Sequence, residues 1–289
     1  MDLEYLRAHP ETIPRLVEHQ RIRITPLGGA KGGRVERWTL DDGTDLFAKV
    51  TAEPSDALPA EGRSLRWLAE PGVAAVPEVL LAVPEMLVTA WVDGGPATVA
   101  GAERFGRELA ALHASGAPTF GAESDGVLAT LTLRNTPEPD WPTFYVKHRC
   151  EPFLRQARDA GALTAAQAST IDAALERVAD AAGPPEPPAR LHGDLWSGNV
   201  LPGRVGDVDG WWLIDPAAYG GHRETDLAML ALFGAPHLDR VLAAYDEVTP
   251  LAPGWRDRVG LHQLHPLLVH CVLFGAGYAS QTLAAARSF

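Results

Sequence analysis

The chain has 289 residues, enough for more than one hydrophobic core, and 46% of them are hydrophobic and 21% charged. Its formal net charge of −12 argues against a broad nucleic-acid surface, which needs a basic face. The apolar segment 267–279 is too short to span a bilayer, and the first ten residues lack the features of a signal peptide. We therefore expect no nucleic-acid partner, no membrane association and a cytoplasmic location, with Cys150 and Cys271 as buried thiols rather than a disulfide.

The first ninety residues predict a small, strand-rich lobe that begins with an amphipathic helix. Alternating apolar positions separated by turn residues favour strands, whereas a wider apolar spacing favours helices. The expected strands cover residues 21–26, 35–40, 45–50, 78–83 and 86–92, and the expected helices cover 1–19 and 58–69.

The rest of the chain predicts mostly helices. A run of Asp93, two glycines and Pro96 marks a joint, and a proline-rich linker at 183–189 precedes a short strand at 190–192. The expected helices cover 99–115, 141–160, 164–182 (opened by a Thr164 cap), 224–233, 237–247, and a helix or helix pair over 255–287. This order predicts an α+β, two-lobed, protein-kinase-like fold, with a small antiparallel-sheet lobe over 1–92 and a larger helical lobe over 93–289.

The most informative motif is LHGDLWSGNV at 191–200, followed by an apolar strand at 211–214 that ends in Asp215. An Asp, an Asn five residues later and a second Asp about twenty residues on form the constellation that phosphoryl transfer requires. Asp194 is expected to accept the proton of an attacking hydroxyl, and Asn199 and Asp215 to hold Mg²⁺, which prefers oxygen ligands. The alternative is a polar turn in which these side chains bond only the local backbone.

Lys49 ends an apolar strand and is expected to reach the phosphates of ATP. Glu61 is the preferred carboxylate partner for it, with Glu53 and Glu70 as alternatives. The loop GGAKGG includes Gly28 and Gly29, whose backbone groups are expected near the phosphates, although a plain hairpin turn explains the loop equally well.

Two further groups of residues are expected to support this site. Backbone groups of Ala90 and Val92 are expected to bond the adenine edge, with Leu87 and Trp91 packed nearby. Asp226 is expected to cap either its own helix or the catalytic loop, and His192 to support that loop.

The remaining histidines give weaker signals. His113 is expected to be a hydrogen-bonded packing residue. A metal site on one helix is an alternative reading of three histidines spaced by three and five residues, although no cysteine or carboxylate joins them: His262, His265 and His270.

Four segments resemble the fructosamine kinase family, a branch of the aminoglycoside phosphotransferase-like kinases. LHGDLWSGNV resembles the family's HGDLWxGN, and IDPAAYGGHRETDLAML resembles its IDPAxYxGxRExDLAM. The helix at 141–157 and the C-terminal segment at 261–278 resemble two further family motifs. The loop GGAKGG departs from the family's phosphate loop, which reads GGxIN or GGxIS.

This resemblance implies phosphorylation, by ATP with Mg²⁺, of the sugar 3-hydroxyl of a ketosamine, either a small molecule or a glycated lysine on a protein, as deglycation repair. It places Trp196, Tyr219 and Arg149 near the substrate. One alternative is a related kinase acting on an aminoglycoside or a choline-like alcohol. The other is a nucleotide-binding pseudokinase that acts as a regulator.

Overall fold

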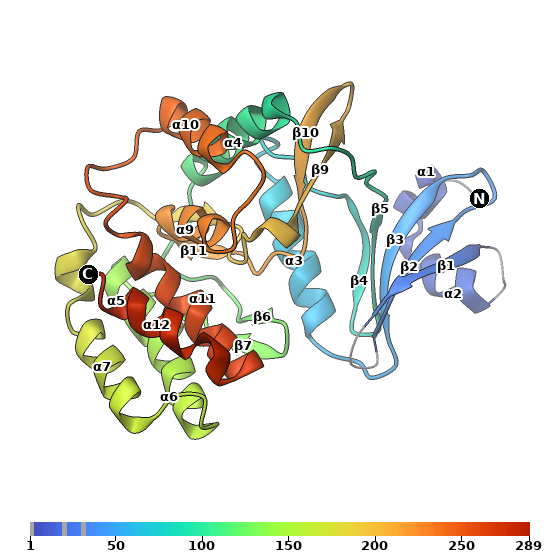
Figure 1. The fold of residues 1–289 in the computed structure, drawn as a ribbon. Coiled ribbons are helices and arrows are strands. Elements are labelled where there is room, and N and C mark those ends of the chain that lie inside the picture. The colour runs from blue at the N-terminus through green and yellow to red at the C-terminus, as the bar shows by residue number, and fades with distance from the viewer. Residues whose placement is uncertain (1–2, 19–21, 30–32) are drawn as a thin grey trace.

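The computed structural model describes residues 3–18, 22–29 and 33–289 and has two lobes, one built on a sheet and one mainly helical (Figure 1). The small lobe contains a five-stranded antiparallel sheet in the order β1-β2-β3-β5-β4. Its strands are β1 (Arg23–Gly28), β2 (Gly33–Thr39), β3 (Asp45–Thr51), β4 (Val79–Val83) and β5 (Met86–Ala90), and its helices are α1 (Leu3–Ala8), a 3₁₀ turn (Pro10–Thr12), α2 (Ile13–Glu18) and α3 (Ala57–Ala69).

The alternation of side chains along β3 places different chemistry on the two faces of this sheet. Leu46 and Ala48 are buried in the core beneath α1 and α2, together with Trp38 of β2. Phe47 and Lys49 lie on the opposite face, where α3 separates the sheet from the helical lobe (Figure 1). One face therefore stabilises the small lobe, and the other is available for a site between the lobes.

The large lobe has two hydrophobic cores, one around α5 to α7 and α11, the other around α4, α9 and α10. Its helices are α4 (Val99–Ala114), α5 (Trp141–Phe144), a π-helix (Tyr145–Cys150), α6 (Glu151–Asp159), α7 (Ala165–Leu175), α8 (Val178–Ala181), α9 (Glu224–Leu232), α10 (Leu238–Val248), α11 (Val259–Phe274) and α12 (Ala279–Ala286), with 3₁₀ turns at Ser197–Asn199 and Ala276–Tyr278. Its strands are β6 (Gly126–Leu128), β7 (Leu131–Leu133), β8 (Ala189–Leu191), β9 (Val200–Val205), β10 (Val208–Leu213) and β11 (Tyr219–Gly221).

Several predicted elements differ from the observed ones. The helix predicted over 1–19 is broken at Pro10, and its ends, like Lys31 of the glycine-rich loop, lie outside the described residues. The hairpins β6–β7 and β9–β10 interrupt a lobe expected to be almost wholly helical beyond its short strands. Helix 164–182 divides into α7 and α8, although Thr164 caps α7 as expected, in a capping box with Gln167.

The helix predicted over 141–160 contains a π-helical turn whose cause lies in its sequence. Pro152 has no N–H, so the carbonyl of His148 loses its α-helical partner. Arg149 Nη1 donates to that carbonyl at 3.3 Å, and the wider turn directs four of its six residues into the core. Among the described residues, no helix is long and apolar enough to cross a membrane.

Candidate active site

The hairpin β9–β10 brings Asn199 and Asp215 together although sixteen residues separate them. Val200 pairs with Leu213, and the Ile214 N–H donates to the Asn199 carbonyl at 3.0 Å, so Asp215 follows directly beside Asn199. Asp215 has a φ of 54°, in the left-handed region that Asp tolerates better than most residues. The unpredicted strand β9, paired with β10, thus explains how the loop that carries Asp194 and Asn199 lies beside Asp215.

Asn199 also fixes the side chain of Asp194. Its Nδ2 donates to the Asp194 backbone carbonyl at 2.9 Å and to Asp194 Oδ2 at 2.8 Å. The Asn199 amide oxygen therefore points away from Asp194, and Asp194 Oδ1 accepts no hydrogen bond from any described residue. Burial raises the pKa of Asp194 to about 7, and the Asp215 and Asp226 charges add to this against the opposing Asn199 hydrogen bond.

Asp226 holds the backbone just before Asp194. Its carboxylate accepts from the His192 N–H at 2.7 Å and the Gly193 N–H at 3.0 Å. His113 Nε2 lies 3.2 Å from the same carboxylate, and its Nδ1 lies 2.9 Å from the Tyr245 hydroxyl. Of the two expected targets, Asp226 therefore bonds the catalytic loop rather than its own helix, and His113 is the hydrogen-bonded packing residue that the sequence predicts.

His192 joins the loop to the end of the hairpin. Its Nε2 lies 2.9 Å from the Ile214 carbonyl, and its Nδ1 accepts from the Asp194 N–H at 3.3 Å. Burial lowers the pKa of His192, so the neutral ring that this pattern requires is favoured near neutral pH. His192 thereby links the residue before Asp215 to the backbone of Asp194.

Lys49 forms the predicted ion pair with Glu61 and a second one with Asp215. Its Nζ lies 2.7 Å from Glu61 Oε1 and 2.8 Å from Asp215 Oδ1, so the ammonium joins β3, α3 and the end of the hairpin. Burial lowers the pKa of Lys49, but the two carboxylates outweigh it and raise the pKa above its ordinary value. Glu53, the alternative partner, is exposed, and Glu70 pairs with Arg190 instead.

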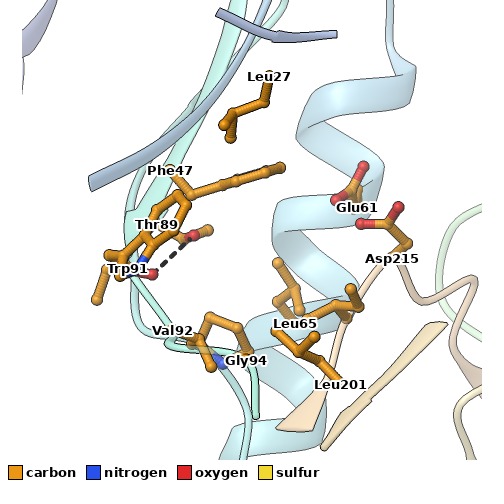
Figure 2. Close-up of a pocket in the computed structure, with 13 residues that line it drawn as sticks. Leu27, Phe47, Glu61, Leu65, Thr89, Trp91, Val92, Gly94, Leu201 and Asp215 are labelled. Atoms are coloured by element: carbon orange, nitrogen blue, oxygen red, sulfur yellow. Dashed lines mark hydrogen bonds between the residues drawn. The ribbon is translucent and has the colours of Figure 1, made fainter. Parts of the chain in front are cut away.

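A pocket of about 280 Å³ opens beside this ion-pair cluster. Figure 2 shows Phe47 and Trp91 on one side, Leu65 and Leu201 on the other, and the carboxylates of Glu61 and Asp215 at one end. The walls are mainly apolar, and the charged groups are confined to that end. Such a lining suits a flat, weakly polar ring system with an anionic extension.

The strand-to-joint segment at 89–92 forms one rim of this pocket. Ala90 donates its N–H to the Glu78 carbonyl at 2.9 Å, so only its carbonyl can bond a ligand. The Val92 N–H bonds no described residue. Leu87, expected beside the adenine, is fully buried and does not line the pocket, where Thr89 and Phe47 lie instead.

Leu27, the residue just before the glycine-rich loop, lines the same pocket, so the start of the loop lies close to it. Gly28 and Gly29 have φ values of 146° and 149°. A Cβ at Gly29 would lie 2.2 Å from the Gly33 carbonyl oxygen, so a side chain there would separate the two ends of the loop.

Two sets of residues offer metal ligands. The Asn199 amide oxygen and the Asp215 carboxylate, whose side chain is 44% exposed, supply the hard oxygens that Mg²⁺ prefers. His222, Glu224 and His262 also place ligand atoms within 4.8 Å of one another, but Arg258 already bonds both Glu224 oxygens, at 2.5 and 2.9 Å. The alternative set of three helix histidines is not a cluster, because the Nδ1 atoms face different partners, Thr225, the Arg149 carbonyl and the Pro266 carbonyl.

The three residues expected near the substrate occupy different environments. Trp196 is 39% exposed and lies two residues after Asp194. Tyr219 is buried, and Arg149 is fully buried with its guanidinium 3.9 Å from the Tyr219 ring centroid. Arg149 donates to the Arg134 carbonyl and to Asn135 Oδ1, which makes it a packing residue. The expectation of direct substrate contact therefore fails for Arg149 and Tyr219, because both side chains are buried in the core and contact each other there.

Comparison with known proteins supports the chemistry that this geometry suggests. A family model described as fructosamine kinase matches residues 11–288. The chain belongs to the fructosamine kinase family. It is accordingly an ATP-dependent phosphotransferase.

Individual relatives agree with this family assignment. A probable ketoamine kinase of Enterococcus faecium is 38% identical over 197 residues, 68% of each chain. A crystal structure from Thermobifida fusca, assigned provisionally as a fructosamine-3-kinase, has a TM-score of 0.89 and 48% identity, covering 95% of this chain and 96% of that one. An aminoglycoside phosphotransferase in ternary complex with AMP-PNP and hygromycin B shares the fold, with a TM-score of 0.63 and 16% identity over 96% of this chain and 98% of that one. The predicted α+β, two-lobed, kinase-like fold is thereby confirmed.

Proposed function

We propose that this enzyme transfers the γ-phosphoryl group of ATP to the sugar 3-hydroxyl of a ketosamine. The observation that supports this most strongly is the arrangement of Asp194, with one free carboxylate oxygen, beside Asn199 and Asp215 at the end of an apolar pocket. The names of its relatives support a ketosamine as the class of substrate. Deglycation repair follows from this chemistry, because a 3-phosphorylated ketosamine breaks down and releases the amine.

In this proposal the adenine lies in the pocket, between Phe47 and Leu201. The Ala90 carbonyl accepts from the exocyclic amine, and the Val92 N–H donates to the ring. The ammonium of Lys49, directed by Glu61, faces the phosphates together with backbone groups of Gly28 and Gly29.

Asn199 and Asp215 would hold Mg²⁺ through the oxygens that do not bond Asp194 and Lys49. An ion held there would neutralise charge on the phosphate oxygens. A carbonyl-type oxygen and a partly exposed carboxylate satisfy its preference for hard ligands and leave room for water and phosphate.

Asp194 accepts the proton of the attacking hydroxyl through its free Oδ1. A pKa of about 7 suits a general base near neutral pH, because the carboxylate is then available and still basic enough to take a proton. Asp226 and His192 keep the loop backbone in place, so that the base is aligned before the substrate arrives.

The experiment is a turnover assay with ATP and the ketosamine formed from glucose and methylamine, 1-deoxy-1-methylaminofructose, with ³¹P NMR to locate the new phosphate. We expect transfer to the 3-hydroxyl and none to the 3-deoxy analogue. Choline and an aminoglycoside, assayed in parallel, address the related-kinase alternative. ATP binding without turnover of any acceptor would instead support the pseudokinase alternative.

The partners and location are part of the same proposal. Acceptors are free ketosamines or glycated lysines on proteins, with no nucleic-acid or membrane partner, as the net charge of −12 suggests. Dependence on ATP supports a cytoplasmic location.

A further inference from the structure

A continuous aromatic surface extends from the catalytic loop to the end of α11. Neighbouring ring centroids lie 6.3 Å apart for Trp196 and Phe233, 5.0 Å for Phe233 and His270, and 4.8 Å for His270 and Tyr278. Phe274 completes it, 5.4 Å from His270. We call these five residues the aromatic wall: Trp196, Phe233, His270, Phe274 and Tyr278.

The wall is unusual because it is exposed. Four Trp, Tyr or Phe side chains in the described residues count as exposed, and three of them lie in the wall: Trp196 (39%), Phe233 (41%) and Phe274 (65%). These rings come from three elements that are distant in sequence, the catalytic loop, the end of α9 and the end of α11. Contiguous exposed apolar surface on a folded chain commonly marks a binding site.

The end of the wall nearest the catalytic base has a fixed position. A Cβ at Gly198 would lie 2.2 Å from Trp196 Cη2, so the indole packs directly against the loop backbone between Asp194 and Asn199. The wall therefore begins on the catalytic loop, two residues after Asp194, and continues over exposed rings of α9 and α11.

His270 adds a ring-nitrogen acceptor to this wall. Its Nδ1 lies 2.7 Å from the Pro266 carbonyl, which can only accept, so Nδ1 carries the proton and Nε2 keeps a lone pair. No described residue bonds Nε2. A wall of ring faces whose few polar atoms include the His270 Nε2 acceptor and the Tyr278 hydroxyl suits an organic cation with apolar substituents, because ring faces attract cations and ring edges and faces bury hydrocarbon.

Resting on the proposed function, we infer that the aromatic wall binds the amine side of the ketosamine and selects substrates whose nitrogen carries an extended apolar chain. At neutral pH the substrate nitrogen is a secondary ammonium, flanked by the sugar on one side and by the amine's own substituent on the other. With the 3-hydroxyl at Asp194, that substituent must leave the site, and the wall is the apolar path that begins there. The methylene stem of a glycated lysine and the chain of a free alkylamine share this chemistry.

The test compares three fructose ketosamines, made from methylamine, from n-butylamine and from the lysine of a short peptide. In the wild-type enzyme we expect kcat/KM to be higher for the butylamine and peptide adducts than for the methylamine adduct. Phe233→Ala and Phe274→Ala should each lower kcat/KM for the two long-chain adducts by roughly two- to tenfold while leaving the methylamine adduct and the KM for ATP nearly unchanged. Phe274→Leu should retain part of the preference, because it keeps apolar area but not the ring.

Val248→Ala is the matched control, since Val248 is exposed on α10 and belongs to neither the pocket nor the wall. Thermal melting of each variant verifies folding. Equal kcat/KM for the methylamine and butylamine adducts in the wild type, or an unchanged ratio in both Phe→Ala variants, would overturn the inference. If the kcat/KM of the peptide adduct does not exceed that of the butylamine adduct, the wall binds the alkyl chain and makes no further contact with a peptide. Absence of turnover with all three would overturn the proposed function itself and this inference with it.

Discussion

At the scale of single residues, the site depends on side chains that each use one atom to hold a neighbour and leave another free. Asn199 donates from its amide nitrogen to Asp194, and its amide oxygen stays available for a ligand. Asp194 accepts that bond on Oδ2 and keeps Oδ1, and Asp215 bonds Lys49 through Oδ1. In each side chain one atom is held by a hydrogen bond or ion pair, which positions the other atom while leaving it free to bond a ligand.

Asp194→Asn should lower kcat by on the order of 10²–10⁴ and leave ATP affinity nearly unchanged, because the amide keeps the shape of the side chain but cannot accept the proton. Single-turnover kinetics and nucleotide titration measure the two quantities. Asp172→Asn, an exposed change on α7, is the control. Near-wild-type turnover in the Asp194 variant would show that another group is the base.

Glu61→Gln should raise the KM for ATP more than it lowers kcat, because Lys49 then loses one of its two charged partners and is held less firmly toward the phosphates. Glu53→Gln removes the same charge from an exposed site nearby and should have little effect. Steady-state kinetics with varied ATP provide the comparison. Equal effects of the two changes would remove Glu61 from its assigned role.

At the scale of elements, the sequence predicted those parts of the site that local pattern determines. The position of Lys49 at the end of a predicted strand and of Glu61 near the start of a predicted helix favoured this pair over Glu53 and Glu70, and the two side chains do form an ion pair. The contact of Lys49 with Asp215 was missed, because it depends on how the two lobes lie against each other rather than on any local spacing.

The failures at this scale have physical causes. Strand β9 was missed because its glycine and proline weaken the strand pattern, although Leu201 on it lines the pocket. Arg149 and Tyr219 were assigned to the substrate because they lie in motifs that resemble the family's, and such a resemblance does not distinguish buried motif residues from those that face a substrate. Here they are buried together in a cation–π contact.

Thr164→Ala should destabilise the protein by about 1 kcal/mol, the typical cost of losing an N-cap side chain. Thr164 Oγ1 accepts from the Gln167 N–H, and Gln167 Oε1 accepts from the Thr164 N–H, so the change breaks a reciprocal cap of α7. Urea unfolding measures the loss, and kinetics should be unaffected. Thr170→Ala, a change at a half-buried position inside the same helix, should cost less.

At the scale of the whole molecule, buried charges tie helices of the large lobe together. Glu224, at the start of α9, bonds Arg258, which immediately precedes α11. This link fixes the helix that carries Asp226 relative to the helix that carries His270.

The division of the chain into two lobes at residues 92 and 93 stays a prediction.

The stability of the protein should fall below pH 4.5 partly because of Glu224. Burial raises the pKa of Glu224, but the neighbouring His262 and the two hydrogen bonds from Arg258 outweigh it and lower the pKa to about 2, from 4.5 in the unfolded chain. The folded state therefore binds fewer protons, so this group's stabilisation is complete above pH 4.5 and is lost as the pH falls toward 2.

Unfolding of wild type and Glu224→Gln between pH 6 and pH 3 tests this. The variant should be less stable at pH 6, because it leaves Arg258 buried without its counter-charge. The difference in the free energy of unfolding between wild type and variant should become smaller as the pH falls. A gap that stays constant over this range would show that Glu224 does not account for the acid sensitivity.

The positive φ of Asp215 has a consequence for how this enzyme could lose its activity over generations. Asn and Gly, both one nucleotide away from either Asp codon, are residues that tolerate the left-handed backbone. A lineage can therefore drop the carboxylate without disturbing the chain path that carries it. With Asp215 in its proposed role as a magnesium ligand, a single-step change to Asn or Gly is expected to remove activity and keep the fold, and relatives that carry either residue at this position are the ones to test for lost activity.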